Sequence, residues 1–401
     1  MNRQKSAVGL SGIVLSTALV LVAVAIAGGL RLPVLARPEQ RGATPAPAAV
    51  GPAATAARAV AAANAFLGTL GAAERAKTAF PFDSPQKSNW SNLPTGAYQR
   101  NNLRLGDLTS AQRDAAMALM AVVLSRDGYQ KAVDIMNADE YLKNNPARGR
   151  PGGGTRGGQA GPGAQPAPAA VTPQNPPPAG APRGGGGRGG GANFGLAEYY
   201  IAVLGTPSVT TPWMVQFGGH HLALNVTIAG GSHALTPSLP ATQPATYTLN
   251  GQSIRPLGDE NDKGFALINA LGAKQQAQAI LPSRVTDLVL GAGQDGKVIQ
   301  PEGLLASAMT PAQQTMLLDL AHEWVGILND DGAAVRMAEI RSNLPRTYFA
   351  WSGPTTAGSV AYYRIQGPTV VIEYAPQNSV EHVHTIYRDP TNDYGARFVK
   401  P

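Results

Sequence analysis

Trp213-Met214-Val215-Gln216-Phe217 and His220-His221-Leu222-Ala223-Leu224-Asn225-Val226-Thr227-Ile228 are two closely spaced runs of mainly apolar and β-branched residues. Such runs predict two β-strands, 213–217 and 220–228, and Gly230-Gly231 predicts a hairpin turn after the second strand. Shorter runs at 199–204 and 245–249 have the same character. The centre of the chain is therefore expected to form an antiparallel sheet.

Helical patterns lie on both sides of this β-rich region, and further strands follow near the C-terminus. Apolar spacing predicts helices over 54–78, 110–125 and 129–141, with Asp127-Gly128 as a break between the last two. The order helices, strands, helices, strands, without strict βαβ alternation, predicts an α+β fold with a largely antiparallel sheet and flanking helices. The later elements are helices at 260–271, 273–281 and 310–328, and strands at 346–351, 360–365, 369–374 and 382–387.

Two helix starts resemble each other. Thr109-Ser110-Ala111-Gln112 and Thr310-Pro311-Ala312-Gln313 are both capping boxes, and each is followed by a second helical pattern. A repeated pair of helices would explain this resemblance. Capping chemistry alone could also produce it, so both explanations stay open at the level of sequence.

Glycine and proline mark the parts of the chain that are unlikely to pack into a core. The 47 glycines and 33 prolines are concentrated before residue 60 and between residues 147 and 192. We expect residues 31–53 to be a disordered Ala/Pro-rich tether and residues 145–192 to be a disordered insertion. Residues 54–401 would then form a single domain interrupted by that insertion, although the insertion could also mark a true domain boundary.

The net charge of +7 does not predict a nucleic-acid partner. Ten basic residues and only one acidic residue lie in the two low-complexity regions, at 1–50 and 147–192. The remainder carries slightly more acidic than basic residues, so it has no basic surface of the kind that DNA or RNA requires. We therefore expect a small molecule or an extracellular substrate of unknown identity as the partner.

The absence of cysteine restricts the possible cofactors. A disulfide framework, a thiolate nucleophile and a cysteine-bound zinc or iron–sulfur cluster are all excluded. The sequence also contains no phosphate-binding glycine loop and no dinucleotide fingerprint, so no nucleotide cofactor is expected. Any metal must be held by nitrogen and oxygen ligands.

Residues 1–30 have the pattern of an export signal. Arg3 and Lys5 precede an uncharged apolar run from Ala7 to Leu30, and Ala25-Ile26-Ala27 fits a cleavage site. The protein is therefore expected to be exported to the periplasm or beyond the cell. Because the run is long for a signal peptide, an uncleaved segment that anchors the chain in the inner membrane is the alternative. No other membrane contact is expected.

Histidine clustering is the clearest chemical signal. His382 and His384 are two residues apart in a strand-like run, which directs both imidazoles to one face, and His220-His221 lies in another such run. If the latter run is extended, its two histidines point to opposite faces and at most one joins the other pair. The four histidines predict one bound divalent metal ion, and zinc is the first candidate. Structural histidines bonded to neighbouring groups or to water are the alternative.

Three charged residues near the histidines are candidates for catalytic roles. Glu373 interrupts an apolar run and could serve as a further ligand, or it could pair with Arg364 on the neighbouring strand. Glu381 could act as a general base if the backbone bulges, and Arg388 could bind an anion. Ordinary turn chemistry also explains the residues that follow Arg388.

Several multi-residue blocks appear together in one order. They are Trp213-x-x-Gln216-Phe217-x-Gly219-His220-His221-Leu222, Arg255-Pro256-Leu257-Gly258-Asp259-Glu260, Tyr362-Tyr363-Arg364-Ile365-Gln366-Gly367-Pro368, Glu373-Tyr374, His382-x-His384 and Arg388-Asp389-Pro390-Thr391-Asn392-Asp393-Tyr394-Gly395. In these blocks the chain resembles the bacterial proteins grouped as domain of unknown function 3500, from about Ala54 onward. The Gly/Pro insertion departs from the compact pattern of that family. The resemblance implies the identity of the domain and draws attention to its histidines, but it implies no reaction.

Two functions remain open from the sequence. In the first, an exported enzyme uses His220 or His221, with His382 and His384, to hold a metal that activates water for hydrolysis. In the second, an exported protein binds a ligand without catalysis and its histidines are structural. The second hypothesis places the ligand on an aromatic surface formed by Trp213, Phe217, Trp351, Tyr362 and Tyr363.

Overall fold

The structure is a computed structural model that describes residues 51–146 and 192–399. The predicted export segment, most of the tether and most of the insertion lie outside these residues. Within the described ranges, no helix has both the length and the apolar character that crossing a membrane requires.

The described α-helices occupy two stretches of sequence, one before and one after the first group of long strands. Their starts follow the sequence signals closely, because Thr109 and Thr310 cap their helices through the predicted capping boxes. The helices are α1 (Pro52–Gly68), α2 (Ala72–Thr78), α3 (Ser110–Val123), α4 (Arg126–Asn144), α5 (Gly258–Ala270), α6 (Ala273–Ala279), α7 (Pro311–Val325) and α8 (Asp330–Ser342).

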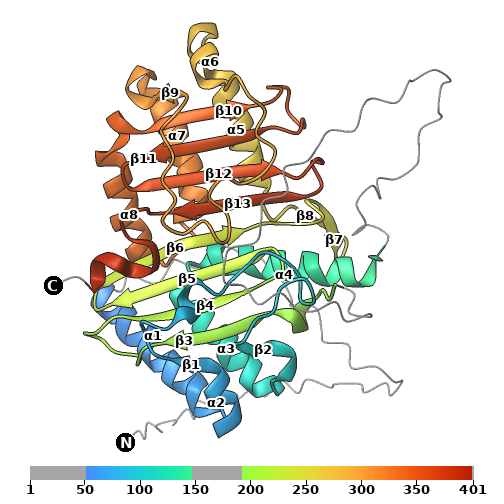
Figure 1. Ribbon diagram of the computed structural model, residues 1–401, viewed down its shortest axis with the longest axis vertical. Helices are drawn as coiled ribbons and strands as arrows, with labels where there is room; N and C mark the ends of the chain where they lie inside the picture. Colours follow the sequence, from blue (N-terminus) through green and yellow to red (C-terminus); the bar gives the residue numbers. More distant parts are fainter. Residues whose placement is uncertain (1–50, 147–191, 400–401) are drawn as a thin grey trace, which may run out of the picture. The chain divides into compact units, whose positions relative to one another are not determined.

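One large sheet organises the domain (Figure 1). Its strand order is β1-β3-β4-β5-β6-β13-β12-β11-β10-β9, β2 pairs with β3, and the long strands are all antiparallel to their neighbours. This arrangement confirms the predicted α+β fold. The strands are β1 (Ala79–Phe80), β2 (Leu103–Arg104), β3 (Tyr200–Leu204), β4 (Trp213–Gly219), β5 (Leu222–Ala229), β6 (Ser232–Pro240), β9 (Leu304–Leu305), β10 (Tyr348–Ser352), β11 (Tyr362–Gly367), β12 (Val370–Pro376) and β13 (Val383–Arg388), with β7 (Tyr247–Leu249) and β8 (Gln252–Ile254) forming a separate hairpin.

The two faces of the sheet are covered differently. On one face, Val383 and Tyr387 of β13 pack in a core that includes side chains of α5 and α7. On the other face, Ile386 packs against Trp90 and Leu288. Those two residues belong to irregular connections, which we name the first covering segment (residues 81–102) and the second covering segment (residues 282–303). His384 shares the face of Ile386, because strand side chains alternate.

The domain is built from two halves with the same order of elements. In each half, two helices, one or two short strands and two more helices precede four antiparallel strands (Figure 1). The short strands are β1 and β2 in the first half and β9 in the second, and the four antiparallel strands are β3–β6 and β10–β13. The halves meet where β6 pairs with β13, with Tyr387 opposite Ser238. Equivalent hydrogen bonds recur as well, since Gln112 donates to the Thr69 carbonyl and Gln313 to the Ala270 carbonyl. The helix-pair repeat is thus confirmed and extends to the sheet.

Three predicted details of secondary structure are wrong. The strand expected from His220 begins at Leu222, because His220 and His221 form the turn before β5. Asp127-Gly128 does not break a helix but lies in the first turn of α4, where Ser125 accepts a hydrogen bond from the Gly128 N–H. No strand was predicted over Ser232–Pro240, yet this run follows the predicted turn at Gly230-Gly231 and forms β6 at the centre of the sheet.

Candidate metal centre

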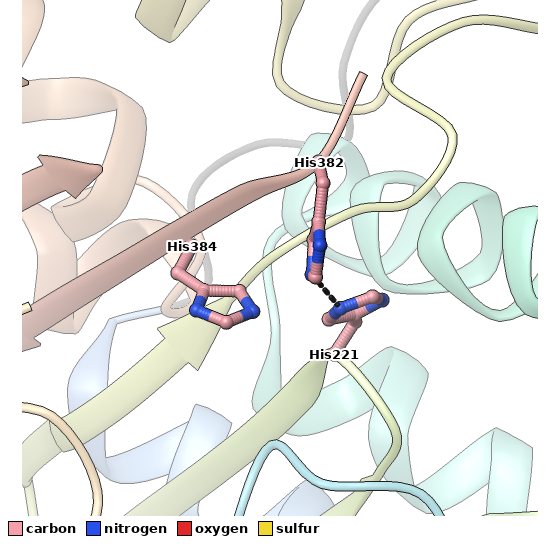
Figure 2. A group of neighbouring side chains, drawn as sticks. All are labelled: His221, His382 and His384. Carbon is pink, nitrogen blue, oxygen red and sulfur yellow. Dashed lines mark hydrogen bonds between the residues drawn. The ribbon is translucent and has the colours of Figure 1, made fainter. Parts of the chain in front are cut away.

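Three imidazoles from two distant parts of the chain converge at one end of the sheet (Figure 2). His221, His382 and His384 each present one ring nitrogen, and these nitrogens lie within 4.8 Å of one another. The Nε2 atoms of His221 and His382 are 2.9 Å apart. His221 is buried, whereas His382 and His384 are half-buried, so the group can be reached from solvent. The predicted meeting of the two histidine clusters is confirmed.

A tight turn between β4 and β5 positions His221. Its φ of 61° lies in the left-handed region. Its N–H donates to the Asn92 carbonyl, and its own carbonyl accepts from the Ala241 N–H. The turn depends on close backbone approach, because a Cβ on Gly218 would lie 2.3 Å from the Leu222 carbonyl oxygen.

The turn also decides where His220 lies. Because residues 220 and 221 are not extended, their side chains do not point to opposite faces, and the two rings stack with centroids 3.6 Å apart. His220 is not a member of the three-imidazole group. Its Nδ1 lies 2.6 Å from Oδ1 of Asp139, a buried residue of α4 whose other oxygen accepts from the Gly195 N–H. Asp139 thereby fixes the ring that stacks on His221.

The start of β13 positions the other two imidazoles. His384 lies within the strand opposite Ala375, and His382 lies just before it, two residues away on the same face as predicted. The His382 carbonyl accepts from the Gln377 N–H. The two ring centroids are 4.7 Å apart, closer than the ~7 Å between alternate residues of an extended strand.

Burial keeps the imidazoles of His221 and His382 neutral. It lowers the pKa of His382 to about 3, with a further contribution from the neighbouring His384. Burial also holds the pKa of His221 well below its usual range, helped by the adjacent imidazoles of His220, His382 and His384. A neutral imidazole carries the free lone pair that a metal ion needs. The environment therefore favours the protonation state of a ligand.

Polar groups from the two covering segments surround His384. Its Nδ1 lies 3.6 Å from Oδ1 of Asp287, which also accepts a hydrogen bond from Nε2 of Gln377. Its Nε2 lies 3.4 Å from Nδ2 of Asn92. A carboxylate beside the outer nitrogen of an imidazole is the usual way of orienting a metal-binding histidine. With Nδ1 directed to Asp287, Nε2 is the nitrogen left for a metal.

Glu373 is not a member of the imidazole group. It lies opposite Arg364, in the register expected for the alternative pairing, and it accepts hydrogen bonds from the backbone N–H groups of Val289 and Leu290. Burial raises the pKa of Glu373 to about 7. Its role in the structure is to hold the second covering segment, which carries Asp287, against the sheet.

Arg388 and Glu381 also lie outside the imidazole group. The Arg388 guanidinium is buried and pairs with Asp295 at 2.9 Å and with Asp393 at 2.7 Å, so it is not free to bind a substrate anion as hypothesised. It also donates to the Leu290 carbonyl and so anchors the second covering segment. Glu381 is exposed, and its carbonyl accepts from the Ala245 N–H.

Asp139, Asp287 and Asn92 were not identified from the sequence. Asp139 had a usable signal, because the apolar stripe of Tyr129, Val133 and Met136 on α4 continues at helical spacing onto an acidic pair, Asp139-Glu140. Acidic residues on a buried helix face require partners. Asp287 and Asn92 lie in covering segments without periodicity, so no local pattern marks them.

Replacing Asp287 by asparagine should weaken divalent-metal binding by ~10-fold, the low end of the 10–100-fold range for groups that orient a ligand. The low end applies because the Asp287 side chain is 59% exposed and lies 3.6 Å from the ring. A competition titration with a chromogenic chelator measures the change. Glu381→Gln is the matched control, since it removes the same charge from an exposed neighbour of His382, and it should leave the affinity unchanged. Equal losses in both variants would argue for a general charge effect instead.

No curated protein and no solved structure matches the chain. The family model described as protein of unknown function (DUF3500) matches residues 52–396, which include both halves of the sheet and all three converging imidazoles. The chain therefore belongs to the DUF3500 family.

Proposed function

We propose that the protein is an exported metal-dependent hydrolase in which His221, His382 and His384 hold one divalent ion. The observation that carries this proposal is the convergence of three imidazole nitrogens within 4.8 Å, from two segments that are distant in sequence. Nitrogens bound at ~2.1 Å to one tetrahedral ion stand ~3.4 Å apart, so only small side-chain movements separate the structure from a bound state. The neutral state that burial imposes on His221 and His382 also supports it.

Zinc is the metal we propose. The donor set is three imidazole nitrogens, a set that catalytic zinc sites use. Three protein ligands leave one coordination position open, and a zinc ion in such a site supplies an activated water molecule for hydrolysis. Zinc is tested against other metals by measuring which ion the purified protein retains.

Residues around the three imidazoles provide what a hydrolase needs in addition. Asp287 is an exposed carboxylate next to His384, within reach of a water molecule at the site. A surface depression of about 250 Å³ is lined by Thr286, the residue before Asp287, and by Pro376. Pro376 pairs with Val383, which lies between His382 and His384 in the sequence. We propose that this depression holds part of the substrate.

The alternative of a ligand surface built from aromatic side chains has no support in the structure. The five residues concerned are all buried, and Trp351, Tyr363 and Tyr374 stack on one another inside the core beneath α5 and α7. Four of the five serve packing alone, and only Tyr362 also lines the depression described above. The buried five are Trp213, Phe217, Trp351, Tyr362 and Tyr363.

Metal analysis of protein purified without a histidine tag tests the proposal directly. We expect close to one zinc ion per chain after dialysis, and restoration of that value when chelator-stripped protein is supplied with zinc. A value near zero in both preparations would remove the metal site and the hydrolase with it. Export rests on residues 1–30 alone and is tested separately, by locating the full-length protein in cell fractions.

A further inference from the structure

A second cavity lies at the start of β6, between α8 and the C-terminal segment. Its volume is about 150 Å³. Its apolar wall comes from α7, α8, β6 and the short helical segment Asp393–Phe398. Leu235, Leu328, Val335 and Phe398 are apolar residues of this wall.

The repeat of the two halves makes this cavity the counterpart of the metal centre. Ala234 of β6 is paired with Thr227 of β5, and His384 of β13 is paired with Ala375 of β12. Once the bulge between β5 and β6 is allowed for, Ala234 is the residue of the first half that corresponds to His384. By the same register, Ser232 corresponds to His382.

The third imidazole also has an equivalent. His221 lies in the turn between β4 and β5, and the corresponding turn between β11 and β12 contains Thr369. Arg336, which lines the cavity, donates a hydrogen bond to the Thr369 carbonyl. The metal centre takes His221 from the first half and His382 and His384 from the second, whereas its counterpart takes Thr369 from the second half and Ser232 and Ala234 from the first. Serine, alanine and threonine provide none of the nitrogen ligands of a zinc site. Their side chains are smaller than imidazoles and leave space at this position.

The charges at this cavity neutralise one another. Arg336 pairs with Glu339 at 2.5 Å and with Asp389 at 3.1 Å, and Arg397 pairs with the same two carboxylates at 2.9 and 3.1 Å. This closed group of two cations and two anions has no formal charge left to offer a ligand. His233 also lines the cavity, and burial lowers its pKa, which keeps its imidazole neutral.

We propose that this cavity is a second ligand site, for a small neutral ring compound of the size of phenol. A cavity of ~150 Å³ with apolar walls accepts a molecule of benzene size in other proteins. The Tyr387 hydroxyl, which accepts a hydrogen bond from Arg336, and the Asn392 side chain provide polar groups at the wall for one hydroxyl of the ligand. A charged ring would have to give up its hydration without gaining a counter-ion.

Ligand titrations followed by NMR test both the site and its selectivity. The probes are phenol, benzoate and benzylamine, which share a ring and differ in charge. We expect saturable binding of phenol with a dissociation constant on the order of 1 mM, as a ligand of seven heavy atoms allows. Benzoate and benzylamine should bind at least ~10-fold more weakly, because the cavity offers them no unpaired opposite charge.

A matched pair of variants locates the binding. Val335 lines the cavity and is 67% exposed, so Val335→Trp fills its mouth without disturbing the core. Val298 is 84% exposed and does not line it, so Val298→Trp is the control. Phenol affinity should fall at least ~10-fold in the first variant and stay constant in the second. Failure of phenol to saturate the unmodified protein, tighter binding of benzoate or benzylamine, or equal loss in both variants would overturn the proposal. None of these results depends on bound metal.

Discussion

Replacing His382 by alanine should lower the affinity for zinc a few hundredfold and abolish stoichiometric metal in the purified protein. Structural zinc sites bind with ~10–16 kcal/mol from four ligands, so one imidazole accounts for about 3–4 kcal/mol, or a few hundredfold in affinity. The remaining nitrogens of His221 and His384 cannot compensate, because two ligands do not enclose a zinc ion. Any hydrolytic activity should disappear together with the metal.

The fold should survive this substitution, which separates ligation from a structural role. His382 is half-buried and its ring makes one hydrogen bond, at 2.9 Å, to the His221 ring, so its removal from the metal-free protein should change stability by only ~1 kcal/mol. Thermal unfolding in the presence of a chelator measures this. His322→Ala, on the exposed side of α7, is the control and should retain full metal. Retention of metal by the His382 variant, or loss of folding in it, would contradict ligation.

The part of the metal centre that depends on local periodicity was predicted from the sequence. His382 and His384 share a face because strand side chains alternate, and this holds wherever the strand packs. That the second histidine cluster would meet them depended on the pairing of β6 with β13, which no local pattern contains. The clustering of four of the six histidines was the only indication, and it was sufficient.

The choice between His220 and His221 could not be made from the sequence. In an extended run, only one of the two could join His382 and His384, and the sequence does not say which. In the structure the two residues form a turn that brings the Leu222 backbone close to Gly218, and the two ring centroids lie 3.6 Å apart. The conformation of the turn is fixed by hydrogen bonds of His221 with Asn92 and Ala241, which no local pattern in the sequence indicates.

The charged residues show a similar limit. A carboxylate inside an apolar strand does need compensating partners, and this argument about Glu373 is correct. The partners are two backbone N–H groups of the second covering segment and not a metal. Arg388 is engaged in the same way with carbonyls and acidic side chains of irregular segments. Segments without periodicity supply these partners, so only the three-dimensional structure identifies them.

Replacing Asp139 by alanine should both destabilise the domain and weaken the metal centre. Asp139 is 1% exposed, and its two oxygens accept from the His220 ring and from the Gly195 N–H. Two buried donors would be left without an acceptor, at about 1–3 kcal/mol each, so the free energy of unfolding should fall by roughly 2–5 kcal/mol. Chemical denaturation monitored by circular dichroism measures this loss.

The effect on metal should be distinct from the effect on stability. His220 stacks on His221 at 3.6 Å, so releasing the His220 ring loosens the neighbouring ligand, and the affinity for zinc should fall by ~10–100-fold in protein that is still folded. Asp139→Asn keeps one acceptor and the packing, so it should show smaller losses of both quantities. Asp127→Asn, at the exposed start of the same helix, is the control and should change neither by more than a few tenths of a kcal/mol. If Asp139→Ala lowers stability while folded protein binds zinc as tightly as before, Asp139 supports α4 and the 195 backbone only, and the stacked His220 does not position His221.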